Sequence, residues 1–154
     1  MATTSAPAAS EDTNLDTACT AVATEVARTD GKASMLLAFN GAVLAGLASI
    51  ADTGLPSVAK AFGAAAVLAL AAAAVLLLLV VRPRLGGTDQ ASFPYWARLD
   101  EAAIHASMRG DSRPARIRVL SAIAMRKYSL LRHAIDLSLA ALALLVVAAA
   151  SVLV

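Results

Sequence analysis

The apolar residues of this chain form three long runs that are almost free of charge. The first run covers 34–51, the second 61–81 and the third 133–154, and the one charged residue within them is Asp136. An α-helix needs about 20 such residues to cross the ~30 Å hydrocarbon core of a bilayer. The runs therefore predict three transmembrane helices, of which the first is the shortest.

Apolar side chains at helical spacing predict amphipathic helices outside these runs. Over 12–33, one helix face carries apolar residues at intervals of three and four: Leu15, Cys19, Val22 and Val26. The segment 82–132 has a short stretch of this kind at 95–109 and a second one that carries Ile117, Leu120, Tyr128 and Leu131. Residues 1–11 are small and polar and include a proline, so we expect a disordered tail there.

The fold class predicted by these elements is an all-α membrane protein. An amphipathic helix at 12–33 leads into a transmembrane hairpin at 34–81, a basic helical segment follows at 82–132, and the third transmembrane helix at 133–154 closes the chain. The composition agrees, because 59% of the residues are hydrophobic and 16% are charged. Typical soluble domains have about 45–50% and about 25%. A single cysteine, Cys19, excludes a disulfide within the chain.

The basic residues are segregated along the chain and predict its orientation. Ten of the 13 Lys and Arg residues lie in 82–132, whereas the loop at 52–60 carries only Lys60. Basic residues near span ends favour the cytoplasmic side of a membrane. We therefore expect a multi-pass protein of the cell (inner) membrane, with a cytoplasmic N-terminus, a cytoplasmic segment 82–132 and a C-terminus on the outer side.

Motifs of enzymes and metal sites are absent from the sequence. It contains no P-loop and no GxGxxG, HExxH, GxSxG or CxxC pattern. His105 and His133 are its only histidines. We therefore predict a protein that is not an enzyme, with no catalytic residues, no metal ligands and no cofactor.

Two polar residues inside the spans each allow two interpretations. Asn40 either lines a pore or specifies an oligomer, or it forms a hydrogen bond to another helix of the same chain. Asp136 is either a functional acid within the membrane, or a carboxylate at the headgroup level that pairs with Arg132 four residues earlier.

The bases near the third span also allow two interpretations. They either hold anionic lipid, at about 1 kcal/mol for each base, or some of them bind a phosphate-bearing ligand, for which guanidinium groups are suited. The candidate ligand-binding residues are Arg116, Arg118, Arg126 and Lys127. Nucleic-acid binding is not expected, because aromatic residues are few and no recognition fold is indicated.

One local motif is more specific than these patterns. Residues 29–41 read TDGKASMLLAFNG, which resembles the motif A-D-x-K-A-S-x-L-L-x-F-N-G of the Pycsar effector transmembrane family (PycTM). The matching positions are Asp30, Lys32, Ala33, Ser34, Leu36, Leu37, Asn40 and Gly41, and Thr29 stands where alanine is usual. Later elements are similar in order: Arg82-Pro83-Arg84, Phe93-Pro94-Tyr95 and Lys127-Tyr128. The resemblance covers about 12–154.

The resemblance implies an effector of anti-phage defence. A partner cyclase would make a cyclic pyrimidine mononucleotide, cCMP or cUMP, as the activating ligand. In response, the effector would act as a homo-oligomer that disrupts the inner membrane, and the infection would abort. The motif residues that would serve this role are Asp30, Lys32, Ser34 and Asn40. One alternative is a structural or regulatory membrane subunit that docks a cytoplasmic partner through its amphipathic stripes. A small transporter or holin-like pore is less favoured.

Overall fold

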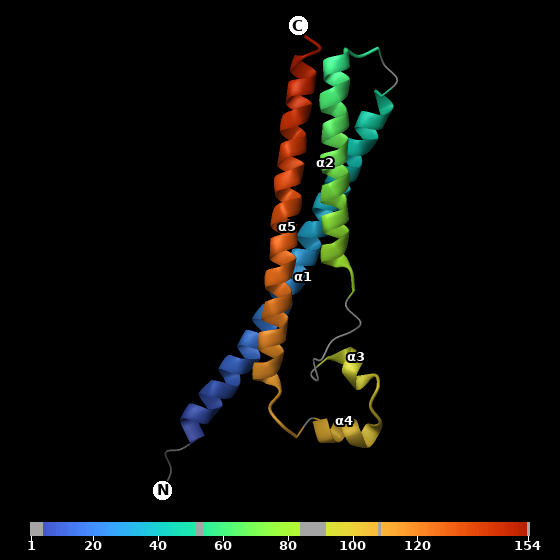
Figure 1. Cartoon of the computed structure of the whole chain (residues 1–154). Coiled ribbons are helices and arrows are strands. Elements are labelled where there is room, and N and C mark those ends of the chain that lie inside the picture. Colours follow the sequence, from blue (N-terminus) through green and yellow to red (C-terminus); the bar gives the residue numbers. More distant parts are fainter. Residues whose placement is uncertain (1–4, 52–53, 84–91, 108, 154) are drawn as a thin grey trace. The chain divides into compact units, whose positions relative to one another are not determined.

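The computed structural model describes residues 5–51, 54–83, 92–107 and 109–153, and every regular element in these ranges is helical (Figure 1). The elements are α1 (Ser5–Ser49), α2 (Ser57–Val81), α3 (Phe93–Trp96), α4 (Glu101–Ser107) and α5 (Arg113–Ala150). Helices α1, α2 and α5 are long and apolar enough to cross a membrane. This confirms the all-α class with three transmembrane helices.

The chain divides into two compact units. The polar unit consists of Met1–Arg28 and Pro83–Arg126, and the membrane unit consists of Thr29–Arg82 and Lys127–Val154. Helices α1 and α5 contribute residues to both units, whereas α2 belongs to the membrane unit alone.

Helix α1 is longer than the sequence pattern predicts. It begins at Ser5, so the prediction of a disordered tail is wrong for residues 5–11, and residues 1–4 lie outside the described part of the chain. The start is rich in alanine, the strongest helix former. Pro7 lies in the first turn, where a backbone N–H has no acceptor within the helix. The helix passes from 12–33 into 34–51 without a break and ends at Ser49.

Helix α5 joins two elements that the sequence analysis separated. One helix from Arg113 to Ala150 contains both the predicted amphipathic helix around Ile117–Leu131 and the predicted third span. Pro114 lies in its first turn, and no glycine or proline occurs after it to break the helix. Conversely, the stretch at 95–109 is not one helix. Residues 97–100 are a turn, and Asp100 Oδ1 accepts the Ala103 N–H at 2.7 Å to cap α4.

Three helix segments pack in the membrane unit, with α1 and α5 parallel to each other and α2 antiparallel to both. Their buried residues recur at intervals of three, four and seven, the pattern of left-handed coiled coils; on α2 they are Ala59, Ala66, Leu70, Ala73, Leu77 and Val80. One cluster joins Ala33, Leu77, Val80, Leu131 and Ala134, and a second joins Ala66, Leu70 and Ala141. In Figure 1 the end of α5 and the turn between α1 and α2 lie at the same end of this unit.

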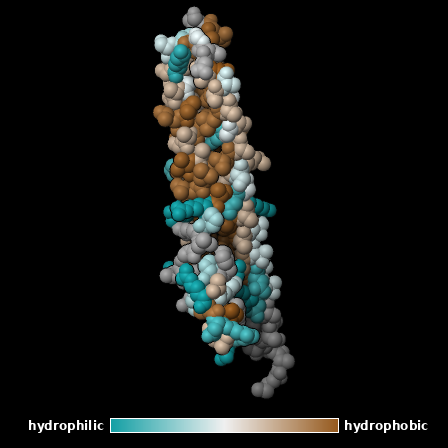
Figure 2. All heavy atoms as spheres, turned by 90° about the vertical axis from the view of Figure 1, so that its right-hand side faces the viewer, coloured by the Kyte–Doolittle hydropathy of each residue, from teal (hydrophilic) through white to brown (hydrophobic). Residues whose placement is uncertain are grey.

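The outer surface of the membrane unit is apolar. Figure 2 shows that hydrophobic side chains predominate over the apolar helices on the face in view. Large exposed residues occur on all three helices: Met35, Phe39, Leu68, Val75, Leu78, Leu139 and Val146. A soluble monomer rarely exposes so extended an apolar surface, whereas lipid solvates it without cost.

Candidate functional site

An ion pair joins α1 to α5 at the first residues of the membrane unit. Lys127 Nζ on α5 contacts Asp30 Oδ1 on α1. The exposed fractions are 16% for the lysine side chain and 37% for the aspartate side chain, so the pair is partly withdrawn from water. The contact therefore links the family motif of α1 to the Lys-Tyr motif of α5, which are 97 positions apart.

The pair is placed by the buried cluster beneath it. Ala33 follows Asp30 by three residues, and Leu131 follows Lys127 by four, so each charged residue lies on the same helix face as a buried apolar one. Ala33 is fully buried and Leu131 is 4% exposed. Close packing of these two helix faces brings the charged side chains together, and no loop has to position them.

The other residues of the family motif face in different directions. Lys32 is exposed and has no ion-pair partner among the residues that the structure describes. Ser34 is also exposed, and its hydroxyl donates to the backbone carbonyl of Asp30 at 3.0 Å. Asp30 therefore pairs with Lys127, and not with the neighbouring Lys32.

Asn40 is fully buried and bonds to α5 of the same chain. Its Nδ2 donates to Ser138 Oγ at 3.1 Å. The Ser138 hydroxyl has two acceptors within reach, Asn40 Oδ1 at 3.2 Å and the Ala134 carbonyl at 3.0 Å. Of the two interpretations of Asn40, the structure supports the hydrogen bond within one chain.

The four candidate ligand-binding bases on α5 differ in their exposure and in their described partners. Arg116, Arg118 and Arg126 are exposed and have no ion-pair partner within the described ranges, whereas Lys127 is occupied by Asp30. A helix turns about 100° per residue, so Arg116 and Arg118 point about 200° apart. The exposed arginines are thus available separately to an anion, but α5 alone does not gather them.

Among the residues that the structure describes, Arg113 is the basic residue with the most ion-pair partners, and it was not among the site residues predicted from the sequence. In the polar unit its guanidinium contacts Asp12 at 2.5 Å, Asp16 at 3.0 Å and Asp111 at 2.9 Å. Asp12 and Asp16 are one turn apart on α1, and this spacing was the available signal for a common partner. The network holds the first residue of α5 against the N-terminal part of α1.

Hydrogen bonding in this network shifts two pKa values. The hydrogen bonds that the Arg113 side chain and backbone donate hold the pKa of Asp111 below its ordinary value. Hydrogen bonds to Asp111, Asp16 and Asp12 raise the pKa of Arg113, which stays charged in any case. Both groups lie at the protein surface, where water weakens such interactions.

Asp136 remains without a partner within the described chain. It is exposed on α5, and the ion pair with Arg132, one of its two interpretations, is not formed. Among the described residues, no group of three or more His, Cys, Asp or Glu side chains could hold a metal ion. His133 Nδ1 instead lies 2.7 Å from the carbonyl oxygen of Ser129.

Comparison with protein families gives one match that spans the helices described above. The model of the PycTM family, the Pycsar effector protein domain, matches residues 14–154. Comparisons with curated proteins and with solved structures found no match. The family match begins in the first amphipathic stripe of α1 and includes the Asp30–Lys127 contact and all three transmembrane helices. The chain belongs to the PycTM family, the Pycsar effector protein domain, as a multi-pass membrane protein.

Proposed function

We propose that this Pycsar effector protein acts in anti-phage defence as a membrane-disrupting switch. It binds cCMP or cUMP made by a partner pyrimidine cyclase, rearranges as a homo-oligomer, and breaches the inner membrane so that the infection aborts. The role is non-enzymatic. The observation that carries the proposal is the ion pair between Asp30 and Lys127, because it joins the two helices through residues that also carry the family resemblance.

The orientation of the membrane unit supports this role. The cluster of Ala33, Val80 and Leu131 places the ends that carry Lys32, Arg82 and Lys127 together, while Lys60 lies at the opposite end of α2. Basic residues favour the cytoplasmic side. The Asp30–Lys127 pair is then on the cytoplasmic side, where a cyclase releases its product.

Competition for positive charge supplies the proposed trigger. A cyclic nucleotide carries one phosphodiester, which attracts ammonium and guanidinium groups. Exposed Arg116, Arg118 and Arg126 attract the anionic nucleotide to α5, and its phosphate then competes with Asp30 for Lys127. Breaking a partly buried pair leaves a charge without its partner, which destabilises the closed contact between α1 and α5.

The composition of the packed surfaces supports reassembly in the membrane. Most buried apolar residues of the membrane unit are alanines, among them Ala66, Ala73, Ala134 and Ala141. Small residues allow close helix contact in lipid without interlocking side chains. Helices released from their partners in one chain can therefore pack equally well against helices of another copy.

The alternative of a subunit that docks a cytoplasmic partner is less well supported. Its motivation was two amphipathic stripes, but the stripe residues Leu15, Val22, Ile117 and Leu120 are already partly buried within the polar unit. These faces are used inside the chain and are not free surfaces.

Direct binding tests the first step. Labelled cCMP and cUMP are titrated against the detergent-purified protein, and we expect saturable binding of one of them. Arg116→Gln, Arg118→Gln and Arg126→Gln are compared with Arg98→Gln, an exposed arginine outside α5. Loss of binding only in α5 variants supports the proposal, and equal binding in all four variants removes these residues from it.

The second step is tested in cells that also express the cyclase. Membrane potential and uptake of an impermeant dye are followed after infection, alongside the cellular cyclic nucleotide concentration. We expect depolarisation and dye uptake once the nucleotide rises. Cells that contain the nucleotide yet retain their potential and exclude the dye would falsify the proposal.

A further inference from the structure

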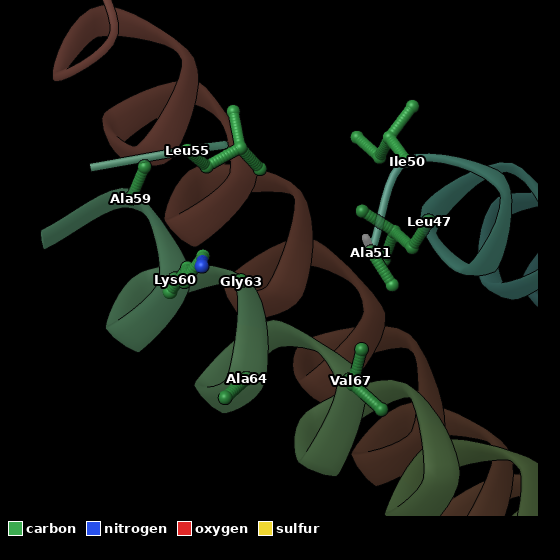
Figure 3. Close-up of a pocket in the computed structure, with 9 residues that line it drawn as sticks. All are labelled: Leu47, Ile50, Ala51, Leu55, Ala59, Lys60, Gly63, Ala64 and Val67. Atoms are coloured by element: carbon green, nitrogen blue, oxygen red, sulfur yellow. The ribbon is translucent and has the colours of Figure 1, made fainter. Parts of the chain in front are cut away.

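A pocket of about 290 Å³ lies where α1 ends and α2 begins in the membrane unit. Figure 3 shows Leu47 and Ile50 from the end of α1 on one side, and Ala59, Gly63 and Val67 of α2 on the other. Apart from Lys60, all of its lining residues are apolar or glycine. The pocket is therefore a hydrocarbon-lined recess with a single cationic group.

That cationic group has no ion-pair partner among the residues that the structure describes. Lys60 lies in the first turn of α2 and is exposed, and no carboxylate among the described residues pairs with it. Its ammonium group is therefore available to an anion, while its methylene groups line the apolar recess.

The depth of the pocket in the membrane follows from the length of α2. Its 25 residues span about 37 Å, more than the ~30 Å hydrocarbon core. The uncharged part of α2 begins directly after Lys60. The ammonium group thus lies at the level of the lipid headgroups, and the apolar lining around Gly63 and Val67 extends toward the acyl chains.

We propose that this pocket binds one phospholipid of the surrounding bilayer. An acyl chain occupies the recess between Leu47 and Val67, and the lipid phosphate contacts Lys60. An anionic phosphatidylglycerol is favoured over phosphatidylethanolamine, because the ethanolamine headgroup carries its own ammonium group. The site is at the opposite end of α2 from the Asp30–Lys127 pair and needs only a membrane-inserted protein, so it is independent of nucleotide binding.

The acyl-chain part of the site is tested by filling the recess. A Cβ added at Gly63 meets no atom within 4 Å, so Gly63→Leu places a side chain in the pocket without a backbone clash. Gly46→Leu is the matched control, because Gly46 is also helical, has the same open surroundings and lies outside the pocket lining. Binding of phosphatidylglycerol is measured by native mass spectrometry of the full chain released from detergent.

We expect Gly63→Leu to lose the first bound phosphatidylglycerol, and Gly46→Leu to retain it. Equal binding in the two variants would show that the recess is not the lipid site. If Gly63→Leu instead removed a dimer of the chain and left lipid binding unchanged, a second copy would be the occupant and the proposal would be wrong.

The phosphate contact is tested by removing the charge. Lys60→Gln should lower the preference for phosphatidylglycerol over phosphatidylethanolamine about fivefold, the effect of one base near an anionic headgroup. Arg82→Gln removes a base from the other end of the same helix and controls for general attraction. A specific site requires the larger effect at Lys60, and equal effects, or none, would contradict it.

Discussion

The side chain of Lys127 is 16% exposed and lies against Asp30, so each charge depends on the other for part of its solvation. We expect Lys127→Ala to lower the free energy of unfolding by about 1–3 kcal/mol, between the values for an exposed and a buried pair. Lys32→Ala removes an exposed lysine that has no ion-pair partner in the described part of the chain. This substitution should change the free energy of unfolding by less than about 0.5 kcal/mol. Thermal unfolding in detergent, followed by circular dichroism, measures both.

A charge exchange separates pairing from packing. The double variant Asp30→Lys with Lys127→Asp restores opposite charges across the same two helices, and we expect it to recover most of the lost stability. Failure of the exchanged pair to recover any stability would mean that Lys127 acts through its methylene packing and not through its charge.

The Asn40–Ser138 hydrogen bond should contribute modestly. We expect a double-mutant cycle of Asn40→Ala and Ser138→Ala to give a coupling free energy of about 0.6 kcal/mol, the average found for hydrogen bonds between membrane helices. The Ser138 hydroxyl keeps the Ala134 carbonyl as an acceptor when Asn40 is removed, which limits the loss. Additive single effects in thermal unfolding would show that the two residues are not coupled.

These residues also mark the limit of what the sequence could indicate. An amide in an apolar span needs a hydrogen-bond partner, so a bond for Asn40 could be predicted from its own surroundings. Ser138 lies 98 positions later, and nothing local identifies it as that partner. The same holds for Lys127, whose charge suggested an external anion, whereas helix packing supplies Asp30.

Helix α1 continues through Gly31, which occupies a variable position of the family motif. A Cβ at this position meets no atom within 4 Å, and a helical glycine is destabilising by about 0.5–1 kcal/mol relative to alanine. We therefore expect Gly31→Ala to raise the midpoint of thermal unfolding. Gly46→Ala, at another open position of α1, should raise it similarly, and a lower midpoint for Gly31→Ala alone would reveal a required bend at the motif.

The start of α5 should respond to acid through Asp111. Because the folded-state pKa of Asp111 is lowered from 3.8, its contribution to stability is complete above the unfolded pKa and is lost as the pH falls through the folded value. Stability of the polar unit should therefore be unaffected by this group between pH 7 and pH 5 and should decline below about pH 4. Hydrogen exchange at the start of α5 at several pH values measures this, and Arg113→Gln should reduce the decline.

Element boundaries were harder to predict from the sequence than the elements themselves. The apolar runs indicated the membrane segments of α1, α2 and α5, because a bilayer requires long uncharged helices. The change from polar to apolar composition near Ser34 suggested a boundary, but nothing there breaks a helix, and α1 continues. The composition of a segment indicates whether lipid or water surrounds it. The ends of a helix depend instead on glycine, proline and capping groups.

The membrane unit as a whole predicts a definite topology. Helices α1 and α5 run in the same direction and α2 runs against them, so successive segments cross in opposite directions and the C-terminal end of α5 lies on the side opposite to Lys127. A fluorescent protein fused to the N-terminus should be fluorescent, and alkaline phosphatase fused to the C-terminus should be active, because the latter folds only outside the cytoplasm. The reverse pattern would contradict the proposed orientation.

The predominance of alanine in the packed surfaces has a kinetic consequence. Alanine has no side-chain rotamers, so separating two such surfaces, or exchanging one helix for its equivalent from another chain, requires only the few larger buried side chains, such as Leu70 and Leu77, to change conformation. The rate of such an exchange is then governed by diffusion of chains in the membrane plane and by breakage of the few polar contacts. For the proposed switch, such packing predicts that helices exchange rapidly once the polar contacts break.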